Sequence, residues 1–153
     1  MIKRIISGGQ TGADRAALDC AIALDIEHGG WCPLGRLTED GAIDQRYKLA
    51  EMPDDDYRKR TRQNVIDSDA TLILNLGDLD GGTLATQRFA IQHGKPFLVI
   101  QLDDSANGDP LETALVWLRD HNPHVLNVAG PRESKRPGIY RLSYDFLSAM
   151  WAR

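Results

Sequence analysis

The clearest chemical pattern in the sequence is a glycine-rich segment, Ser7-Gly-Gly-Gln-Thr-Gly12, which separates an apolar run from a helical pattern. Glycine has no Cβ, so the chain can adopt positive φ and a ligand can approach the backbone closely. Free amides at the start of a helix, together with the helix dipole, favour an anion. We therefore predict a phosphate-binding loop rather than a tight turn that binds nothing. The residues expected to bind there are Gly8, Gly9, Gln10, Thr11 and Gly12.

A second loop of the same kind follows a later apolar run, with the sequence Gly77-Asp-Leu-Asp-Gly-Gly-Thr83. Two glycine-threonine turns that each open a helix are hard to attribute to turn formation alone, so both are predicted to contribute to one site. Asp80 either binds a ribose hydroxyl or caps the following helix, and capping is the favoured interpretation. The ligand-binding residues expected in this loop are Asp80, Gly81, Gly82 and Thr83.

The segment 130–138 places three cations in a chain whose net charge is −4. Arginine's planar guanidinium suits bidentate contacts with phosphate, and Arg132 is the cation nearest to the preceding apolar run. Arg132 is therefore a predicted phosphate contact, whereas Lys135 and Arg136 fit an ordinary charged surface loop. Arg15 follows the 7–12 loop and either contacts the bound anion or pairs with a neighbouring acid.

Apolar runs and helical patterns alternate along the chain, which predicts βαβ units and a mainly parallel sheet. We expect a single Rossmann-like domain over residues 1–153, with three α/β/α layers. The ligand should lie outside the carboxyl ends of the strands, at the topological switch point. The expected strands are 2–7, 28–32, 70–76, 97–102 and 124–129, and the expected helices are 13–24, 58–66, 84–93, 110–121 and 139–151.

A long connection, 33–55, joins the second expected strand to the second helix. Loops of this length usually carry function, local structure or disorder. A surface lid and an Ω-loop without a ligand role are both compatible with its glycines and charges.

Composition limits the classes of function. The acidic balance argues against a nucleic-acid partner, which rewards a concentrated basic face. No run of about 20 apolar residues predicts a membrane helix, and no signal peptide is apparent. The two cysteines and four histidines have neither disulfide-framework nor metal-ligand spacing. A cytoplasmic protein without a direct metal site is expected, and the apolar residues Phe146, Met150 and Trp151 near the chain end predict a homo-oligomer.

Several segments together resemble a known family, the proteins called "putative molybdenum carriers", also described as the circularly permuted YpsA branch of a Rossmann-like superfamily. The resemblance covers nearly the whole chain. The segments that carry it are Ser7-Gly-Gly-Gln-Thr-Gly-Ala-Asp-Arg15, His28-Gly-Gly-Trp-Cys-Pro33, Asp67-Ser-Asp-Ala-Thr-Leu-Ile-Leu74, Asp80-Gly-Gly-Thr83 and Asn127-Val-Ala-Gly-Pro-Arg-Glu-Ser134.

The resemblance implies a strand order. Permutation would insert the fifth strand between the first and the third, giving the order 2-1-5-3-4, with the flavodoxin-like order 2-1-3-4-5 as the alternative. It also implies a ligand, the molybdenum cofactor, which is a phosphorylated pterin. A nucleotide-like phosphorylated ligand is the broader expectation.

The wider superfamily includes phosphoribohydrolases often labelled lysine decarboxylases, and the comparison implies two further points. Arg60 corresponds to an arginine that binds nucleoside monophosphates in those enzymes, whereas Thr86 stands where they carry a catalytic glutamate. We therefore favour a carrier or ligand-binding protein. The alternatives are a nucleotide-processing hydrolase and a structural oligomer with a vestigial site. For a hydrolase, the available carboxylates are Asp14, Asp40 and Asp80.

Overall fold

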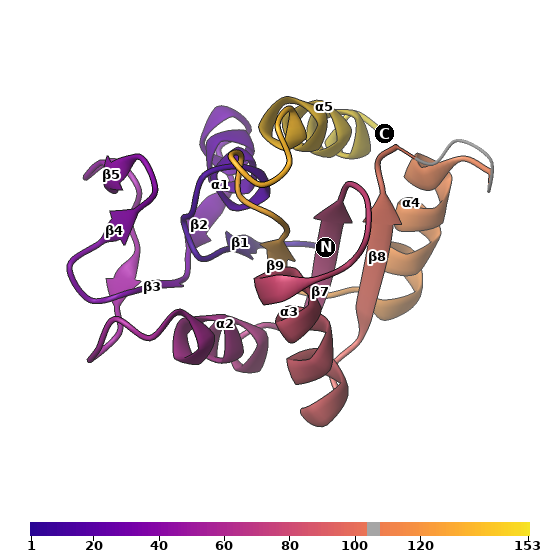
Figure 1. Cartoon of the computed structure of the whole chain (residues 1–153). Coiled ribbons are helices and arrows are strands. Elements are labelled where there is room, and N and C mark those ends of the chain that lie inside the picture. The colour runs from indigo at the N-terminus through magenta and orange to yellow at the C-terminus, as the bar shows by residue number, and fades with distance from the viewer. Residues whose placement is uncertain (104–107) are drawn as a thin grey trace.

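A five-stranded parallel sheet forms the centre of the structure, a computed structural model that describes residues 1–103 and 108–153 (Figure 1). The strands lie in the order β2-β1-β9-β7-β8. Because β9 is the fifth of the expected strands, the predicted order 2-1-5-3-4 is confirmed, and the alternative 2-1-3-4-5 is wrong. The strands are β1 (Arg4–Ile6), β2 (Glu27–Gly29), β7 (Ala70–Asn75), β8 (Phe97–Gln101) and β9 (Val125–Ala129).

The middle of the sheet is apolar and closed on both faces. Every residue of β7 is buried, as a strand covered by helices on both sides requires. The register pairs Ile5 of β1 with Leu126 of β9, and Leu72 of β7 with Val128 of β9. The last strand in the sequence therefore joins two halves of the sheet that are built from earlier parts of the chain.

Helices cover the two faces as the three-layer prediction requires (Figure 1). One face carries α1 (Ala13–Ala23), α4 (Pro110–His121) and α5 (Ile139–Trp151), which share the main apolar core. The other carries α2 (Tyr57–Ile66) and α3 (Gly81–Gln92), which pack together. Among the described residues, none of the helices combines the length and hydropathy needed to cross a membrane.

Local sequence signals determine where several helices begin. The Asp56 side chain accepts a hydrogen bond from the Arg58 amide at 2.9 Å and so caps α2, and Pro110 fits the first turn of α4, where no amide is needed. Helix α3 begins at Gly81 rather than at the expected residue 84, because the glycine pair itself forms its first turn.

The expected strand 28–32 is wrong as a single element. Gly30 has φ of 123°, and a Cβ at this position would lie 2.2 Å from the carbonyl oxygen of Ser7. The chain turns there, so β2 stays in the main sheet while β3 (Trp31–Cys32) pairs with β6 (Ala50–Glu51) in a separate two-stranded sheet.

The long connection 33–55 has local structure of its own. Strands β4 (Leu37–Thr38) and β5 (Gly41–Ala42) form an antiparallel hairpin. Beyond the hairpin, Ile43 and Tyr47 are buried against Leu18 of α1. The base of the connection is therefore anchored to the protein, and the hairpin projects from it.

Apolar residues near the chain end pack inward rather than outward. Met150 is only 4% exposed, and Phe146 and Trp151 are half-buried against the same core. The reason for expecting a homo-oligomer is therefore wrong for these residues, although the oligomeric state itself stays a prediction.

Candidate functional site

A cavity of about 610 Å³ lies where the loops after β1, β7 and β9 meet. Its wall includes Gly8, the glycine pair Gly81–Gly82, and Gly130, together with the side of α2 that carries Arg60. Parallel strands end at the same edge of a sheet, and open α/β sheets bind ligands at that edge. The cavity is where the sequence predicted a ligand to be.

Close backbone contacts lock the loops together. A Cβ at Gly12 would lie 2.4 Å from the Pro131 carbonyl oxygen, which accepts a hydrogen bond from the Ala13 amide at 3.3 Å. A Cβ at Gly130 would lie 2.2 Å from the Leu74 carbonyl oxygen. These glycines are therefore required for packing between loops, and the strand order makes that packing possible by placing β9 beside both β1 and β7.

Arg60 and Asp14 form a buried ion pair in the cavity wall. One guanidinium nitrogen, Nη1, lies 3.2 Å from Asp14 Oδ2, and both side chains are about nine-tenths buried. The Nε of Arg60 is also buried and has no hydrogen-bond partner within residues 1–103 and 108–153. A Cβ at Gly8 would lie 1.4 Å from Nη1, so glycine is needed there to leave room for the guanidinium.

Burial changes the protonation behaviour of Asp14. Desolvation raises the pKa of its carboxyl from 3.8 to about 6, and the nearby charge of Arg60 opposes this only in part. The Gln10 amide also donates to the carboxylate, at 3.4 Å. A carboxyl with such a pKa in a cavity wall can exchange a proton near neutral pH.

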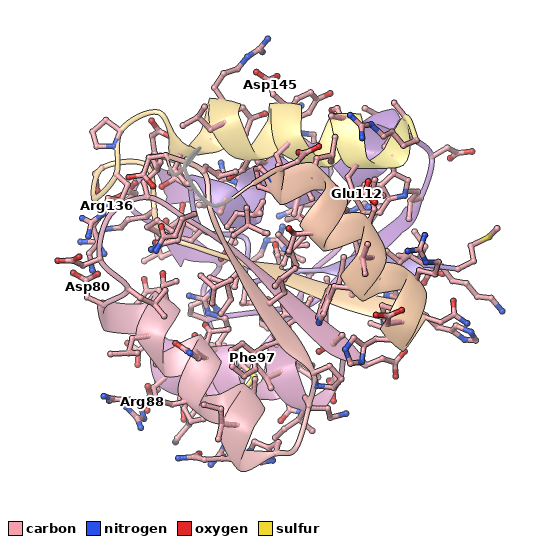
Figure 2. All side chains as sticks on the ribbon, turned by 90° about the vertical axis from the view of Figure 1, so that its right-hand side faces the viewer. Asp80, Arg88, Phe97, Glu112, Arg136 and Asp145 are labelled. Atoms are coloured by element: carbon pink, nitrogen blue, oxygen red, sulfur yellow. The ribbon has the colours of Figure 1, made fainter. Side chains whose placement is uncertain are left out.

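The 77–83 loop differs from its prediction in one respect. Asp80 occupies the N-cap position of α3, but its side chain makes no capping hydrogen bond. Its carboxylate instead pairs with Lys135 at 2.7 Å and Arg136 at 3.4 Å, and Figure 2 shows Asp80 beside Arg136 at one edge of the molecule. The favoured capping role is wrong because two cations compete for the carboxylate, and the first-turn amides of α3 have no cap from it.

The cations of the 130–138 loop have different surroundings. The Nε of Arg136 donates to the Leu76 carbonyl oxygen at 2.8 Å, which attaches this loop to the 77–83 loop. Arg136 is therefore more than the ordinary surface charge that was expected. Lys135 and Arg132 both reach the cavity wall.

The predicted site residues divide between the cavity and its surroundings. Of the twelve, those that line the cavity are Gly8, Gln10, Arg60, Gly81, Gly82, Thr83 and Arg132. The others are Gly9, Thr11, Gly12, Arg15 and Asp80, and they do not line it.

Two of these five show what their positions do instead. A Cβ at Gly9 would meet Leu49 of the long connection at 2.5 Å. Arg15 pairs with Asp40 at 3.1 Å and donates to the Gly9 carbonyl oxygen, which agrees with the acid-pairing alternative. Gly9 therefore leaves room for the long connection to approach closely, and Arg15 holds the connection against the 7–12 loop.

A second hollow, of about 660 Å³, lies on the other side of the 7–12 loop. Its polar side chains largely satisfy one another: the Asp19 carboxylate accepts hydrogen bonds from the hydroxyls of Tyr47 and Tyr140. Burial, reinforced by Asp19, raises the pKa of both tyrosines. Among the described residues, Glu39 alone lines both hollows.

Several cavity residues were not among the predicted ligand-binding residues, although the family resemblance had already drawn attention to Thr86. Asn127 of β9 and Thr86 of α3 are buried in the wall, and Glu39 reaches it from the long connection. Asn127 lies within a recognised motif, which was a usable signal, whereas nothing local marks Glu39. The described residues contain no cluster of three or more histidine, cysteine or carboxylate side chains that could hold a metal ion.

These features define a Rossmann-like α/β protein whose interlocked glycine loops surround a cavity at the carboxyl edge of the sheet. Residues 5–151 match the circularly permutated YpsA SLOG family, and the chain belongs to this family. It is similar to a solved structure named as a putative molybdenum carrier protein from Syntrophus aciditrophicus SB, with 50% sequence identity and a TM-score of 0.91. That similarity covers 97% of this chain and 94% of the other. No curated protein matches.

Proposed function

We propose that this protein binds a small phosphate-bearing molecule, a phosphorylated pterin or a nucleotide-like compound, in the cavity at the carboxyl edge of the sheet. The observation that carries the proposal is Arg60, a nine-tenths buried guanidinium in the cavity wall, one nitrogen of which pairs with Asp14. A guanidinium held in this way favours a phosphate, to which it can donate charge-assisted hydrogen bonds.

The rest of the wall supports a phosphorylated ligand. The first turn of α3 supplies amides from Gly82 and Thr83 without a side-chain cap, and a helix N-terminus favours negative charge. Lys135 adds a cation at the same wall. The volume of about 610 Å³ is within the range of pockets that enclose small ligands.

The Syntrophus relative is named as a putative molybdenum carrier protein, and this name favours the pterin within this class. The molybdenum cofactor is a phosphorylated pterin, and the phosphate end of such a molecule fits the amide and cation donors of the cavity. Carriage of that cofactor, rather than its chemistry, would be the role of this chain.

Calorimetric titration with adenosine 5′-monophosphate, a phosphorylated pterin and unphosphorylated adenosine tests the proposal. The first two should bind and adenosine should not. Gly82→Asp adds a like charge at the cavity wall without a steric conflict, because no atom of the described residues lies within 4 Å of a Cβ there. It should weaken binding about tenfold or more, whereas the uncharged Gly82→Asn should change it much less. Equal affinities for the two variants, or no affinity for either phosphorylated compound, would refute the proposal.

A second candidate function, hydrolysis of a nucleotide, rests on Asp14. Its carboxyl lies in the cavity wall with a pKa of about 6, as a general acid or base requires. Thr86 stands in the position of the catalytic glutamate of the phosphoribohydrolases, and its hydroxyl donates to the Gly82 carbonyl oxygen at 3.0 Å. Chromatography of nucleoside monophosphates incubated with the protein decides this. Turnover that disappears in Asp14→Asn, with binding retained, supports a hydrolase, and an inert wild-type protein that still binds the nucleotide excludes it.

A further inference from the structure

The tip of the β4–β5 hairpin inserts one carboxylate, that of Glu39, between the 7–12 loop and the 130–138 loop. The carboxylate accepts hydrogen bonds from the Thr11 hydroxyl and from the hydroxyl and amide of Ser134, the amide at 3.1 Å. It also pairs with Arg132 Nε at 3.3 Å. Two hydroxyls, an amide and a guanidinium are the donors that would hold the oxygens of a phosphate.

The charge of Glu39 fits this position. Partial burial opposes ionisation, but hydrogen bonds from Ser134 and Thr11, with the charge of Arg132, hold the pKa of its carboxyl below the ordinary value. Glu39 is therefore an anion at neutral pH, and it occupies donors contributed by two of the three loops that surround the cavity.

The hairpin is built so that its tip can move while its base stays. Arg36, at the base, donates to the carbonyl oxygens of Ile43 and Tyr47, which fixes the base to the buried part of the connection. Leu37, in the hairpin, is 57% exposed, and β4 and β5 have only two residues each. The tip is attached by polar contacts, which are those of the Glu39 carboxylate and the Asp40–Arg15 pair beside it. The Glu39 amide also donates to Gln10 Oε1 at 3.1 Å, and Arg15 donates to the Thr38 hydroxyl at 3.4 Å.

We propose that Glu39 is an internal anionic ligand, which closes one side of the cavity and is displaced when a phosphate-bearing molecule binds. This inference rests on the proposed function. Because Glu39 lines both hollows, its departure would join them and free Thr11, Ser134 and Arg132 for the ligand. The protein's own carboxylate thus competes with the ligand and sets its affinity.

The test compares Glu39→Gln with wild type, with Glu27→Gln as the matched control. In both variants glutamine keeps the shape of the side chain, and in Glu39→Gln it removes the competing charge. Glu27 pairs with Arg4, its side chain is 71% exposed, and it lines neither hollow. By calorimetry, Glu39→Gln should bind adenosine 5′-monophosphate about tenfold tighter than wild type, and Glu27→Gln should stay within about threefold. Unchanged or weaker binding by Glu39→Gln overturns the proposal.

A second measurement follows the hairpin itself by amide hydrogen exchange. Amides of residues 37–42 should exchange faster in Glu39→Gln without ligand, and faster in wild type once adenosine 5′-monophosphate is bound. Protection of these amides on binding would instead mean that the hairpin closes over the ligand, and would refute displacement.

Failure of the proposed function is distinguished by inorganic phosphate. If no variant binds the nucleotide, the donors of Thr11, Ser134 and Arg132 can still be tested with inorganic phosphate. Its binding is measured as broadening of the phosphate signal in phosphorus NMR. Broadening that is stronger with Glu39→Gln than with wild type supports an internally occupied anion site, and equal broadening overturns it.

Discussion

Replacing Asp14 with asparagine removes an ionisable group from the cavity wall while preserving its shape. Burial raises the pKa of the Asp14 carboxyl from 3.8 to about 6, so the folded protein holds this proton more tightly than the unfolded chain does. The group's stabilising contribution is therefore fully present below pH 3.8 and is lost as the pH rises through about 6. The difference between the two pKa values corresponds to about 3 kcal/mol.

Asparagine cannot ionise, so Asp14→Asn lacks this loss. The free energy of unfolding of the variant, minus that of wild type, should increase by about 2 kcal/mol between pH 4 and pH 7, because part of the full difference is already lost at pH 4. Taking the difference between two pH values removes the constant cost of leaving Arg60 with an uncharged neighbour. Urea denaturation followed by tryptophan fluorescence at pH 4, 5.5 and 7 measures it.

Asp40→Asn is a control of opposite sign. Hydrogen bonds from Arg15 and Thr38 lower the pKa of the Asp40 carboxyl, so wild type gains stability from this group as the pH rises. The free energy of unfolding of Asp40→Asn, minus that of wild type, should therefore fall as the pH rises. A difference for Asp14→Asn that stays constant or falls with pH would refute the reasoning. It would mean that the Arg60 charge outweighs burial at Asp14.

Three glycine substitutions distinguish an effect on the site from an effect on the fold. Gly8→Ala would place a Cβ 1.4 Å from Nη1 of Arg60, so the guanidinium must move, and calorimetry with adenosine 5′-monophosphate should show at least tenfold weaker binding; unchanged affinity would argue that Arg60 does not contact the ligand. Gly130→Ala would place its Cβ 2.2 Å from the backbone oxygen of Leu74, which cannot swing away, and the free energy of unfolding in urea should fall by about 3 kcal/mol or more. Gly82→Ala has open space around its Cβ within the described part of the chain and should change the free energy of unfolding by about 1 kcal/mol or less. If Gly130→Ala and Gly82→Ala lost similar amounts of stability, the packing argument would be contradicted.

Local signals were sufficient for most elements of the fold. Buried parallel strands such as β7 have continuous apolar runs, and helix starts such as Asp56 are marked by capping residues. The order of the strands could not be predicted from local signals, because the residues of β9 do not indicate which strands it pairs with. That order came from family resemblance. The break at Gly30 was missed because it arises from the approach of Ser7, which lies 23 positions away in the chain.

The parts of the candidate site that are formed by glycine turns could be predicted from the sequence. The ion-pair partners of its charged side chains could not. Glycine turns at Gly8 and Gly82 were readable because they combine a strand end with a helix start. The partner of a charged residue is chosen by the fold, so Asp80 was expected to cap a helix although it pairs with Lys135. Glu39 reaches its donors for the same reason, across a long connection whose path local sequence does not specify.

The place of β9 in the sheet has a consequence for how the protein is made. Until residues 125–129 leave the ribosome, β1–β2 and β7–β8 are two separate strand pairs, and a two-stranded unit is only marginally stable in water. Strand β9 follows both pairs in the chain, so neither pair can complete the sheet before β9 is made. The loop after β9 supplies part of the cavity wall, so the cavity is completed only after Val125–Ala129 have joined the two pairs.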